Sequence, residues 1–290
     1  MQTRPRFGID VSSAPGGDPS ADARHAESLG FDVVTVHGDV LHGGGTPREA
    51  WTSITWVAAR TTTVRVATNV LVLPNRHPAV LAKMAATLDG LSGGRLILAL
   101  GAGAAMNAGA FRAFGLTVRS PAAAVDALGE AIDVMRGLWT TERFTYAGDH
   151  YQTVEAELRP RPERRIPIWL GAYGPRMLEL TGRRADGWLP SMFLLPPDDA
   201  YRSMRRVREA AAAAGREPDA VTCGYNGGVL VQEGERSTRE RIAGGPADVA
   251  EQLAELVRCG FDFLNPWPTG DVRHQRERLA HEVLPVLRAA

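Results

Sequence analysis

The segment RLILALGAGAAMNAGAFRAFG, residues 95–115, contains the transition on which the fold depends. Its apolar run, Leu96 to Leu100, is hydrophobic at consecutive positions, as in a parallel strand that is buried on both faces. The run ends at Gly101-Ala102-Gly103, and glycine lets another group approach the backbone closely. These glycines predict either a tight turn into the next helix or a ligand that lies against the end of the strand.

Seven more apolar runs lie along the chain, separated by stretches in which apolar residues recur every three or four positions, as in helices. The seven runs are Phe7–Val11, Asp32–Val36, Val64–Leu71, Ile166–Gly171, Gly187–Pro190, Val221–Val231 and Phe261–Asn265. Eight strands alternating with helices predict a (β/α)8 TIM barrel, with a doubly wound sheet as the alternative. Because the pattern continues without a linker, we expect residues 1–290 to form one domain.

One interval of this pattern is longer than the others. Residues at about 140–165, before the fifth strand, carry apolar residues on both sides of a Gly148-Asp149 turn signal. Two short runs around such a turn predict a β-hairpin. We therefore expect an inserted hairpin on the surface of the barrel.

Composition excludes several classes of protein. Lys and Arg together number 33, as do Asp and Glu, so no net charge favours nucleic acid or a membrane surface. No apolar run approaches the ~20 residues that span a bilayer. The first residues lack the pattern of a signal peptide, so we expect a cytoplasmic protein. Cys223 and Cys259 have no metal or redox spacing, and no metal site is expected.

Two glycine motifs are candidates for binding a cofactor. Gly101-Ala102-Gly103 matches only half of the G-x-G-x-x-G fingerprint, since Met106 occupies the third glycine position, so a dinucleotide turn is not indicated. In WLGAYGPRMLEL, residues 169–180, a strand ends and Gly174-Pro175 opens a helix. The N–H groups at a helix start attract phosphate, and Arg176 could add a charge. The alternative is that Gly-Pro only starts the helix.

Two polar candidates lie at other strands. Asn69 stands among β-branched residues of the third strand and needs hydrogen-bond partners, either in a neighbouring loop or at the barrel mouth. His37 and Asp39 follow the second strand. They could exchange protons with a substrate, or they could be solvated loop residues.

Four segments in order resemble the luciferase-like monooxygenase superfamily. They are LSGGRLILALGAG (91–103), GDHYQTVEAELRPRP (148–162), IPIWLGAYGPRMLELTGRRADGW (166–188) and GGPADVAEQLAELVRCGFD (244–262). Within it, residues 67–107 and GAYGPRMLELTGRRADG are most similar to the branch that uses the deazaflavin coenzyme F420. That branch includes methylenetetrahydromethanopterin reductase and F420-dependent glucose-6-phosphate dehydrogenase.

The resemblance implies a dimeric barrel with the cofactor ring across its C-terminal mouth. It implies a non-prolyl cis peptide at Asn69–Val70 behind the ring, and cofactor contacts near Gly101, Gly103 and Asn107. The phosphate contacts would fall on Gly171, Ala172, Tyr173, Gly174, Pro175, Arg176 and Met177.

The sequence departs from the sugar-phosphate dehydrogenases at their acid–base residues. Their Asp-His pair after the second strand corresponds here to Gly38-Asp39, and their acid after the fourth strand corresponds to Ala104. They also hold the sugar phosphate with lysines, whereas Lys83 is the only lysine here and falls on a predicted helix. We therefore do not expect glucose 6-phosphate as substrate.

The sequence thus predicts an F420-dependent oxidoreductase that transfers a hydride between the deazaflavin and a small organic substrate. We expect it to act as a reductase on a C=C or C=N bond, with Asp39 or His37 supplying the proton. An FMN-dependent monooxygenase is the alternative enzyme, and a non-catalytic flavin-binding protein is the alternative of another class. The expected partners are a small-molecule substrate and a second copy of the chain, with no nucleic acid or membrane.

Overall fold

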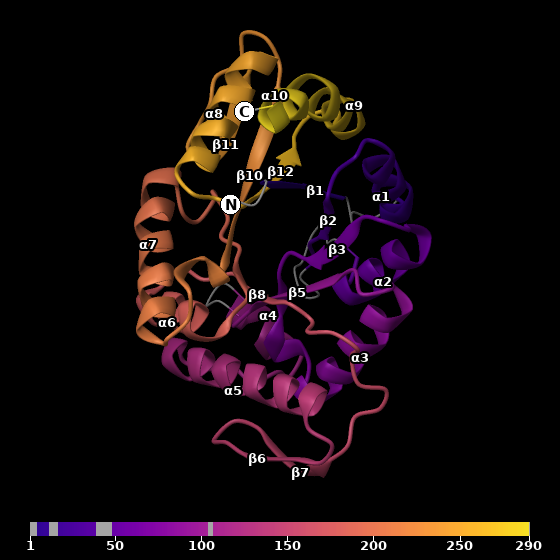
Figure 1. Ribbon diagram of the computed structural model, residues 1–290, viewed down its shortest axis with the longest axis vertical. Helices are drawn as coiled ribbons and strands as arrows, with labels where there is room; N and C mark the ends of the chain where they lie inside the picture. The colour runs from indigo at the N-terminus through magenta and orange to yellow at the C-terminus, as the bar shows by residue number, and fades with distance from the viewer. Residues whose placement is uncertain (1–4, 12–16, 39–47, 104–106, 290) are drawn as a thin grey trace.

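A computed structural model describes residues 5–11, 17–38, 48–103 and 107–289, and in this part of the chain eight parallel strands close into a barrel (Figure 1). They are β1 (Arg6–Asp10), β2 (Val33–Val36), β3 (Arg65–Thr68), β5 (Leu96–Gly101), β8 (Ile168–Leu170), β9 (Gly187–Trp188), β10 (Thr222–Val231) and β12 (Phe263–Pro268). Pairing of β10 with β9 closes the ring. The predicted (β/α)8 barrel is confirmed.

Helices surround the barrel on its outside (Figure 1). They are α1 (Pro19–Ser28), α2 (Ala50–Arg60), α3 (Pro78–Leu91), α5 (Pro121–Thr140), α6 (Pro175–Arg184), α7 (Pro197–Ala213), α8 (Pro246–Arg258), α9 (Val272–Arg278) and α10 (Leu284–Ala289). Six of these helices begin with proline, whose missing N–H has no helical partner at that position anyway. A π-helical turn, Leu279–Val283, joins α9 to α10.

Two details differ from the sequence prediction. The run Val64–Leu71 is not one strand, because β3 ends at Thr68 and the two-residue β4 (Leu71–Val72) pairs with β5 after a break at Asn69–Val70. An additional strand, β11 (Arg241–Gly244), pairs in parallel with the far end of β10. Its four residues are too few to show a periodic pattern.

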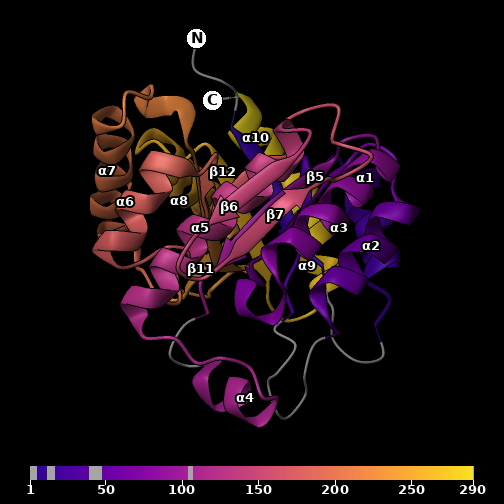
Figure 2. The same ribbon diagram turned by 90° about the horizontal axis from the view of Figure 1, so that it is seen from below.

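The predicted hairpin is present, and it lies outside the barrel. Antiparallel strands β6 (Phe144–Ala147) and β7 (Gln152–Ala156) lie beyond α5 in Figure 1 and face the viewer in Figure 2. The Glu130 carboxylate of α5 accepts backbone N–H groups of the hairpin turn at Asp149, His150 and Tyr151. The short helix α4 (Ala108–Ala113), which follows β5, projects from the body of the protein (Figure 2).

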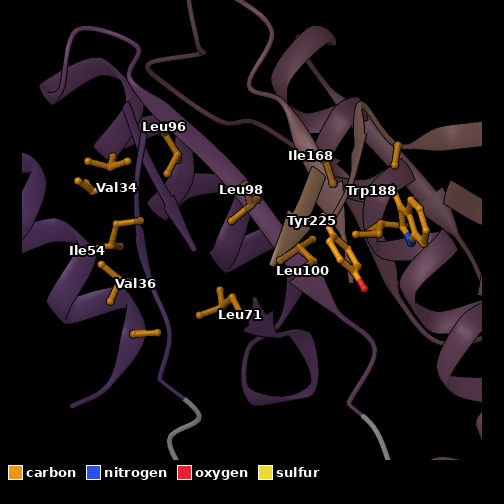
Figure 3. Close-up of a cluster of buried hydrophobic side chains, with 14 of the residues drawn as sticks. Val34, Val36, Ile54, Leu71, Leu96, Leu98, Leu100, Ile168, Trp188 and Tyr225 are labelled. Atoms are coloured by element: carbon orange, nitrogen blue, oxygen red, sulfur yellow. The ribbon is translucent and has the colours of Figure 1, made fainter. Parts of the chain in front are cut away.

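Strand side chains alternate between two apolar layers. One set, including Leu96, Leu98 and Leu100, packs outward against the helices (Figure 3). The other set fills the inside of the barrel and comprises Val33, Ala67, Ile97, Ala99, Trp169, Leu189 and Phe263. Strands buried on both faces explain why the sequence is hydrophobic at consecutive positions.

Candidate active site at the carboxyl ends of the strands

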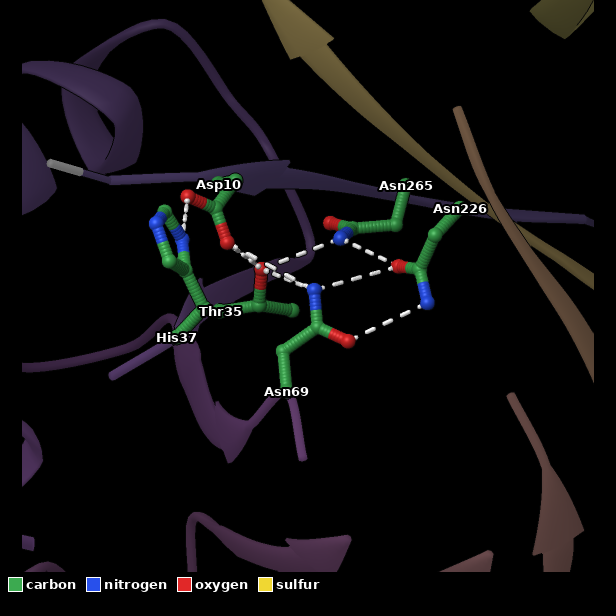
Figure 4. A network of polar contacts seen from close by, with 6 residues as sticks. All are labelled: Asp10, Thr35, His37, Asn69, Asn226 and Asn265. Atoms are coloured by element: carbon green, nitrogen blue, oxygen red, sulfur yellow. Dashed lines mark hydrogen bonds and ion pairs between the residues drawn. The ribbon is translucent and has the colours of Figure 1, made fainter. Parts of the chain in front are cut away.

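A layer of polar side chains lies above the apolar filling of the barrel, at the carboxyl ends of the strands (Figure 4). Asp10 ends β1, Thr35 lies in β2 and Asn69 directly follows β3, while Asn226 and Asn265 come from β10 and β12. Apart from half-buried Asn69, these side chains are buried. The carboxyl ends of the strands are the face at which TIM barrels carry their active sites.

His37 meets a carboxylate at the edge of this layer. Its Nδ1 lies 2.7 Å from Oδ1 of Asp10, which is 7% exposed, whereas the His37 side chain is 50% exposed. The Asp10 charge and this hydrogen bond raise the pKa of His37, and burial opposes them. The imidazole therefore stays protonated to a higher pH than an isolated histidine.

Asp39, which we predicted beside His37, lies outside the described residues. In the described part of the chain, the acid that contacts His37 is Asp10. Asp10 was not predicted, because it is separated from His37 by 27 positions in the sequence. Its position at the end of the strand next to β2 is the signal that could have identified it.

The Asp10 carboxylate is surrounded by donors. Thr35 Oγ1 donates to Asp10 Oδ2 at 2.9 Å, and Asn69 Nδ2 lies 3.5 Å from the same oxygen. Side chains of β2 and of the residue after β3 therefore hold the Asp10 carboxylate in place behind His37.

The opposite side of the mouth is built from glycine and Val70. The Asn69–Val70 peptide is cis, as the resemblance implies. A Cβ on Gly101 would lie 3.0 Å from Val70 Cγ2, and one on Gly171 would lie 3.3 Å from the same atom. Glycine at the ends of β5 and β8 thus leaves room for the Val70 side chain.

Gly103 has a different role from Gly101. Its φ of +81° is in the left-handed region, and a Cβ there would lie 2.9 Å from Pro74 Cγ and 3.0 Å from the Phe111 ring. The backbone must turn here and also pack against α4. The tight turn therefore describes Gly103. At Gly101 the group that approaches the backbone is the Val70 side chain, and a ligand at this point stays a prediction.

The predicted phosphate segment connects β8 to α6. Gly174 precedes α6, no side chain caps the first turn of this helix, and nothing lies within 4 Å of a Cβ built on Gly174. The N–H groups of this turn suit an anion. The Arg176 guanidinium is directed elsewhere in the structure, since its Nη2 lies 2.7 Å from Asp126 Oδ1 on α5.

Three other predicted residues of this segment, Ala172, Tyr173 and Met177, make contacts within the protein. Ala172 is buried, and its carbonyl accepts the indole N–H of Trp188 at 2.9 Å. The Tyr173 hydroxyl accepts the backbone N–H of Ser191 at 3.2 Å, and the half-buried Met177 packs against the core. Trp188 itself is a fully buried core residue.

Besides Oδ1 of Asn265 in the polar layer, two buried polar atoms near the mouth have no hydrogen-bond partner in the described structure. They are Oδ1 of Asn107, which follows β5, and Nε1 of Trp267, which lies in β12. The Trp267 ring is 6.3 Å from the His37 ring between centroids. Because buried polar groups are nearly always paired, these two atoms are suited to meet a bound ligand.

No cluster of potential metal ligands and no helix able to cross a membrane occurs within residues 5–11, 17–38, 48–103 and 107–289. The profile of the luciferase-like monooxygenase family matches residues 18–244. The chain belongs to this family.

Among the luciferase-like proteins, F420-dependent glucose-6-phosphate dehydrogenases are similar to this chain in sequence. The enzyme of Intrasporangium calvum is 30% identical over 91% of this chain and 92% of its own length. The enzyme of Microbacterium testaceum is 34% identical over 68% of this chain, and that match spans only 59% of the relative.

Solved luciferase-like structures share the fold at lower identity. An F420-dependent secondary alcohol dehydrogenase in complex with an F420-acetone adduct superposes with a TM-score of 0.86 at 20% identity, covering 98% of this chain and 99% of that one. The coenzyme F420 dependent tetrahydromethanopterin reductase from Methanopyrus kandleri gives 0.82 at 20% identity, with the same coverage. At this identity the comparison establishes the barrel alone.

Proposed function

We propose that this luciferase-like protein is an F420-dependent oxidoreductase that transfers a hydride between the deazaflavin and a small organic substrate. The observation that carries the proposal is the two-sided mouth of the barrel. Val70, packed against Gly101 and Gly171, offers an apolar surface on one side, and the His37–Asp10 pair lies on the other. The named activities of the sequence relatives support the same cofactor.

The residues at the mouth fit the parts of this cofactor. Val70 would lie behind the ring, and the uncapped first turn of α6 would receive the phosphate. The unpaired Oδ1 of Asn107 would accept a hydrogen bond from the ring or its side chain. When bound, the reduced deazaflavin supplies a hydride from C5.

His37 supplies the proton that balances the reaction. In a C=C or C=N bond of the substrate, one carbon accepts the hydride and the atom bonded to it accepts a proton. We place Nε2 of His37 beside that second atom, so that the bond gains one hydride and one proton. Asp10 stabilises the charged imidazolium before the transfer and holds the neutral ring in the Nδ1–H form afterwards. The protein's main task is to orient donor and acceptor, which is worth several kcal/mol in well-oriented reactions.

Glucose 6-phosphate is not the substrate that we propose, although two relatives are named for it. Lys83, the only lysine of the chain, lies exposed on α3, where Nζ donates to the Arg159 carbonyl. The undescribed residues contain no lysine. A sugar phosphate would therefore lack the lysines that the resemblance leads us to expect.

Binding titrations test the cofactor directly. Purified protein is titrated with F420, FMN and FAD while cofactor or tryptophan fluorescence is recorded, and turnover of reduced F420 is then followed with unsaturated and imine substrates. We expect saturable binding of F420 alone. Tight FMN binding without F420 binding would indicate the monooxygenase alternative, and F420 binding without turnover across the panel would indicate a carrier protein.

A further inference from the structure

Two buried asparagines complete the polar layer without touching His37. Asn226 in β10 is 2% exposed and Asn265 in β12 is 1% exposed. A buried amide is costly unless it is hydrogen-bonded, and a barrel interior is normally filled by apolar side chains. Their contacts with the other polar side chains in Figure 4 show what they do there.

Asn265 sets the direction of the Thr35 hydroxyl. Its Nδ2 donates to Asn226 Oδ1 at 2.7 Å and to Thr35 Oγ1 at 3.0 Å. Because Thr35 Oγ1 accepts a hydrogen bond from Asn265, its own hydroxyl proton is directed to Asp10 Oδ2, 2.9 Å away. Rotating the Asn265 amide by half a turn would bring its oxygen against Asn226 Oδ1, whereas in the observed orientation Asn265 Oδ1 is buried without a partner.

Asn226 sets the direction of the Asn69 amide in the same way. The two amides form a reciprocal pair, in which Asn226 Nδ2 donates to Asn69 Oδ1 at 3.1 Å and Asn69 Nδ2 donates to Asn226 Oδ1 at 3.2 Å. Asn69 Nδ2 consequently faces Thr35 Oγ1 at 3.4 Å and Asp10 Oδ2 at 3.5 Å. The Thr35 hydroxyl proton and one Asn69 amide proton therefore point toward Asp10.

We propose that Asn226 and Asn265 are positioning residues that orient the Thr35 hydroxyl and the Asn69 amide toward Asp10 and thereby hold Asp10 as the acceptor of the His37 Nδ1–H. The consequence is that Nε2 is the nitrogen of His37 that exchanges a proton with the substrate. This inference rests on the proposed function only in stating that a substrate exchanges the proton with Nε2. The tautomer of His37 is a property of the protein itself.

The groups that face His37 in the described structure are consistent with this role. Asp10 on β1 is a charged group that contacts it, and β12 presents the Trp267 ring. The hydrogen bond from Nδ1 to Asp10 is thus one of the contacts that orient the imidazole, and the groups that hold Asp10 act on it.

The test reads the His37 tautomer by 15N NMR of the imidazole in the full chain without cofactor, at a pH above the His37 titration. The His37 signals are assigned with His37→Gln. The wild type is expected to show the Nδ1–H tautomer, and Thr35→Val and Asn265→Ala are expected to show a mixture. Thr35→Ser keeps the hydroxyl and should restore the wild-type signal.

Thr68→Val is the matched control, because Thr68 is also buried in an adjacent strand but its hydroxyl bonds the backbone of Ala99. It should leave the tautomer unchanged even if it lowers stability. Turnover gives the second readout: kcat should fall about tenfold in Thr35→Val and Asn265→Ala, with KM nearly constant, as part of the roughly 10²–10⁴-fold effect of general acid catalysis.

Retention of the Nδ1–H tautomer in both folded variants would overturn the positioning role. The same conclusion follows if Thr68→Val changes the tautomer as strongly as Thr35→Val does. If the wild type shows the expected tautomer but no turnover with F420, the positioning role stands and the proposed function is wrong. The two failures are therefore distinguishable.

Discussion

At the scale of single residues, the proposed chemistry depends on the pair of His37 and Asp10 and on glycines at two strand ends. The pair is brought together by β1 and by the residue after β2, and in the proposed function it exchanges a proton with the substrate. Gly101 and Gly171 contribute by lacking a Cβ, which leaves space for Val70. Single substitutions can test the ion pair and the glycine positions separately.

Replacing Asp10 with Asn tests the ion pair. Loss of the charge should lower the pKa of His37 toward 6.5 and reduce kcat by roughly 10²-fold or more. Because the pKa of His37 is raised in the folded protein, the pair stabilises the fold fully below about pH 6.5, and this contribution is lost as the pH rises through the folded pKa. The variant should therefore lose more unfolding free energy at about pH 6 than at about pH 9.

Denaturant titrations at the two pH values and an NMR titration of His37 measure these effects. Asp89→Asn is the control, because Asp89 is also a buried carboxylate but lies on α3 and accepts the N–H of Leu96. An unchanged His37 pKa in Asp10→Asn would show that the pair does not form in solution.

Replacing Gly101 with Ala tests the contact with Val70. The new Cβ would lie 3.0 Å from Val70 Cγ2, so Val70 must move, and we expect weaker F420 binding together with a destabilisation of about 1–3 kcal/mol. Gly171→Ala, with 3.3 Å to the same atom, should have a smaller effect. Gly90→Ala on α3 is the control, because nothing lies within 4 Å of its Cβ position. Equal F420 affinity in all three variants would contradict the role assigned to Val70.

At the scale of elements, helices and strands are connected by side chains that accept backbone N–H groups. Glu27 of α1 is an example, since one carboxylate oxygen accepts the N–H groups of Thr62, Thr63 and Val64 just before β3. These bonds outweigh burial and lower the pKa of Glu27 to about 2. One side chain therefore positions the start of the strand that leads to Asn69 and Val70.

Glu27→Gln tests this connection. The pKa of Glu27 is lowered in the folded protein, so its contribution to stability is present above about pH 4.5 and is lost as the pH falls toward 2. We expect the variant to lose about 1 kcal/mol at neutral pH, a value that allows for partial solvent screening, and to approach the wild type in acid. Unfolding midpoints between about pH 3 and pH 7 measure the difference, with exposed Glu163→Gln as the control. A difference that does not change with pH would contradict the assignment.

At the scale of the whole molecule, closure of the barrel brings together residues that the sequence separates widely. Asn69 and Asn226 are 157 positions apart, and Thr35 and Asn265 are 230 positions apart, yet each pair is joined by a hydrogen bond. The hairpin β6–β7 lies outside this closed ring (Figure 1). The site is therefore a property of the closed barrel.

Association of two copies, which the family resemblance implies, remains a prediction at this scale. Light scattering on the eluting protein should give about twice the 31.2 kDa of one chain across a range of concentrations. A mass of one chain at all concentrations would contradict it. Thr68→Val, which changes a side chain inside the barrel, should elute at the same position as the wild type.

The sequence alone determined the elements and their order, because hydrophobic periodicity is a local property of the chain. It predicted the eight strands, the hairpin and the glycine ends of β5 and β8, but it missed the four-residue β11 and the break in Val64–Leu71. His37 was singled out because it follows the second strand with Asp39 close by in the sequence, whereas Asp10, 27 positions away, was not. Only the tertiary structure decided which polar side chains meet, since that depends on strand order, register and closure, which join residues that no local pattern connects.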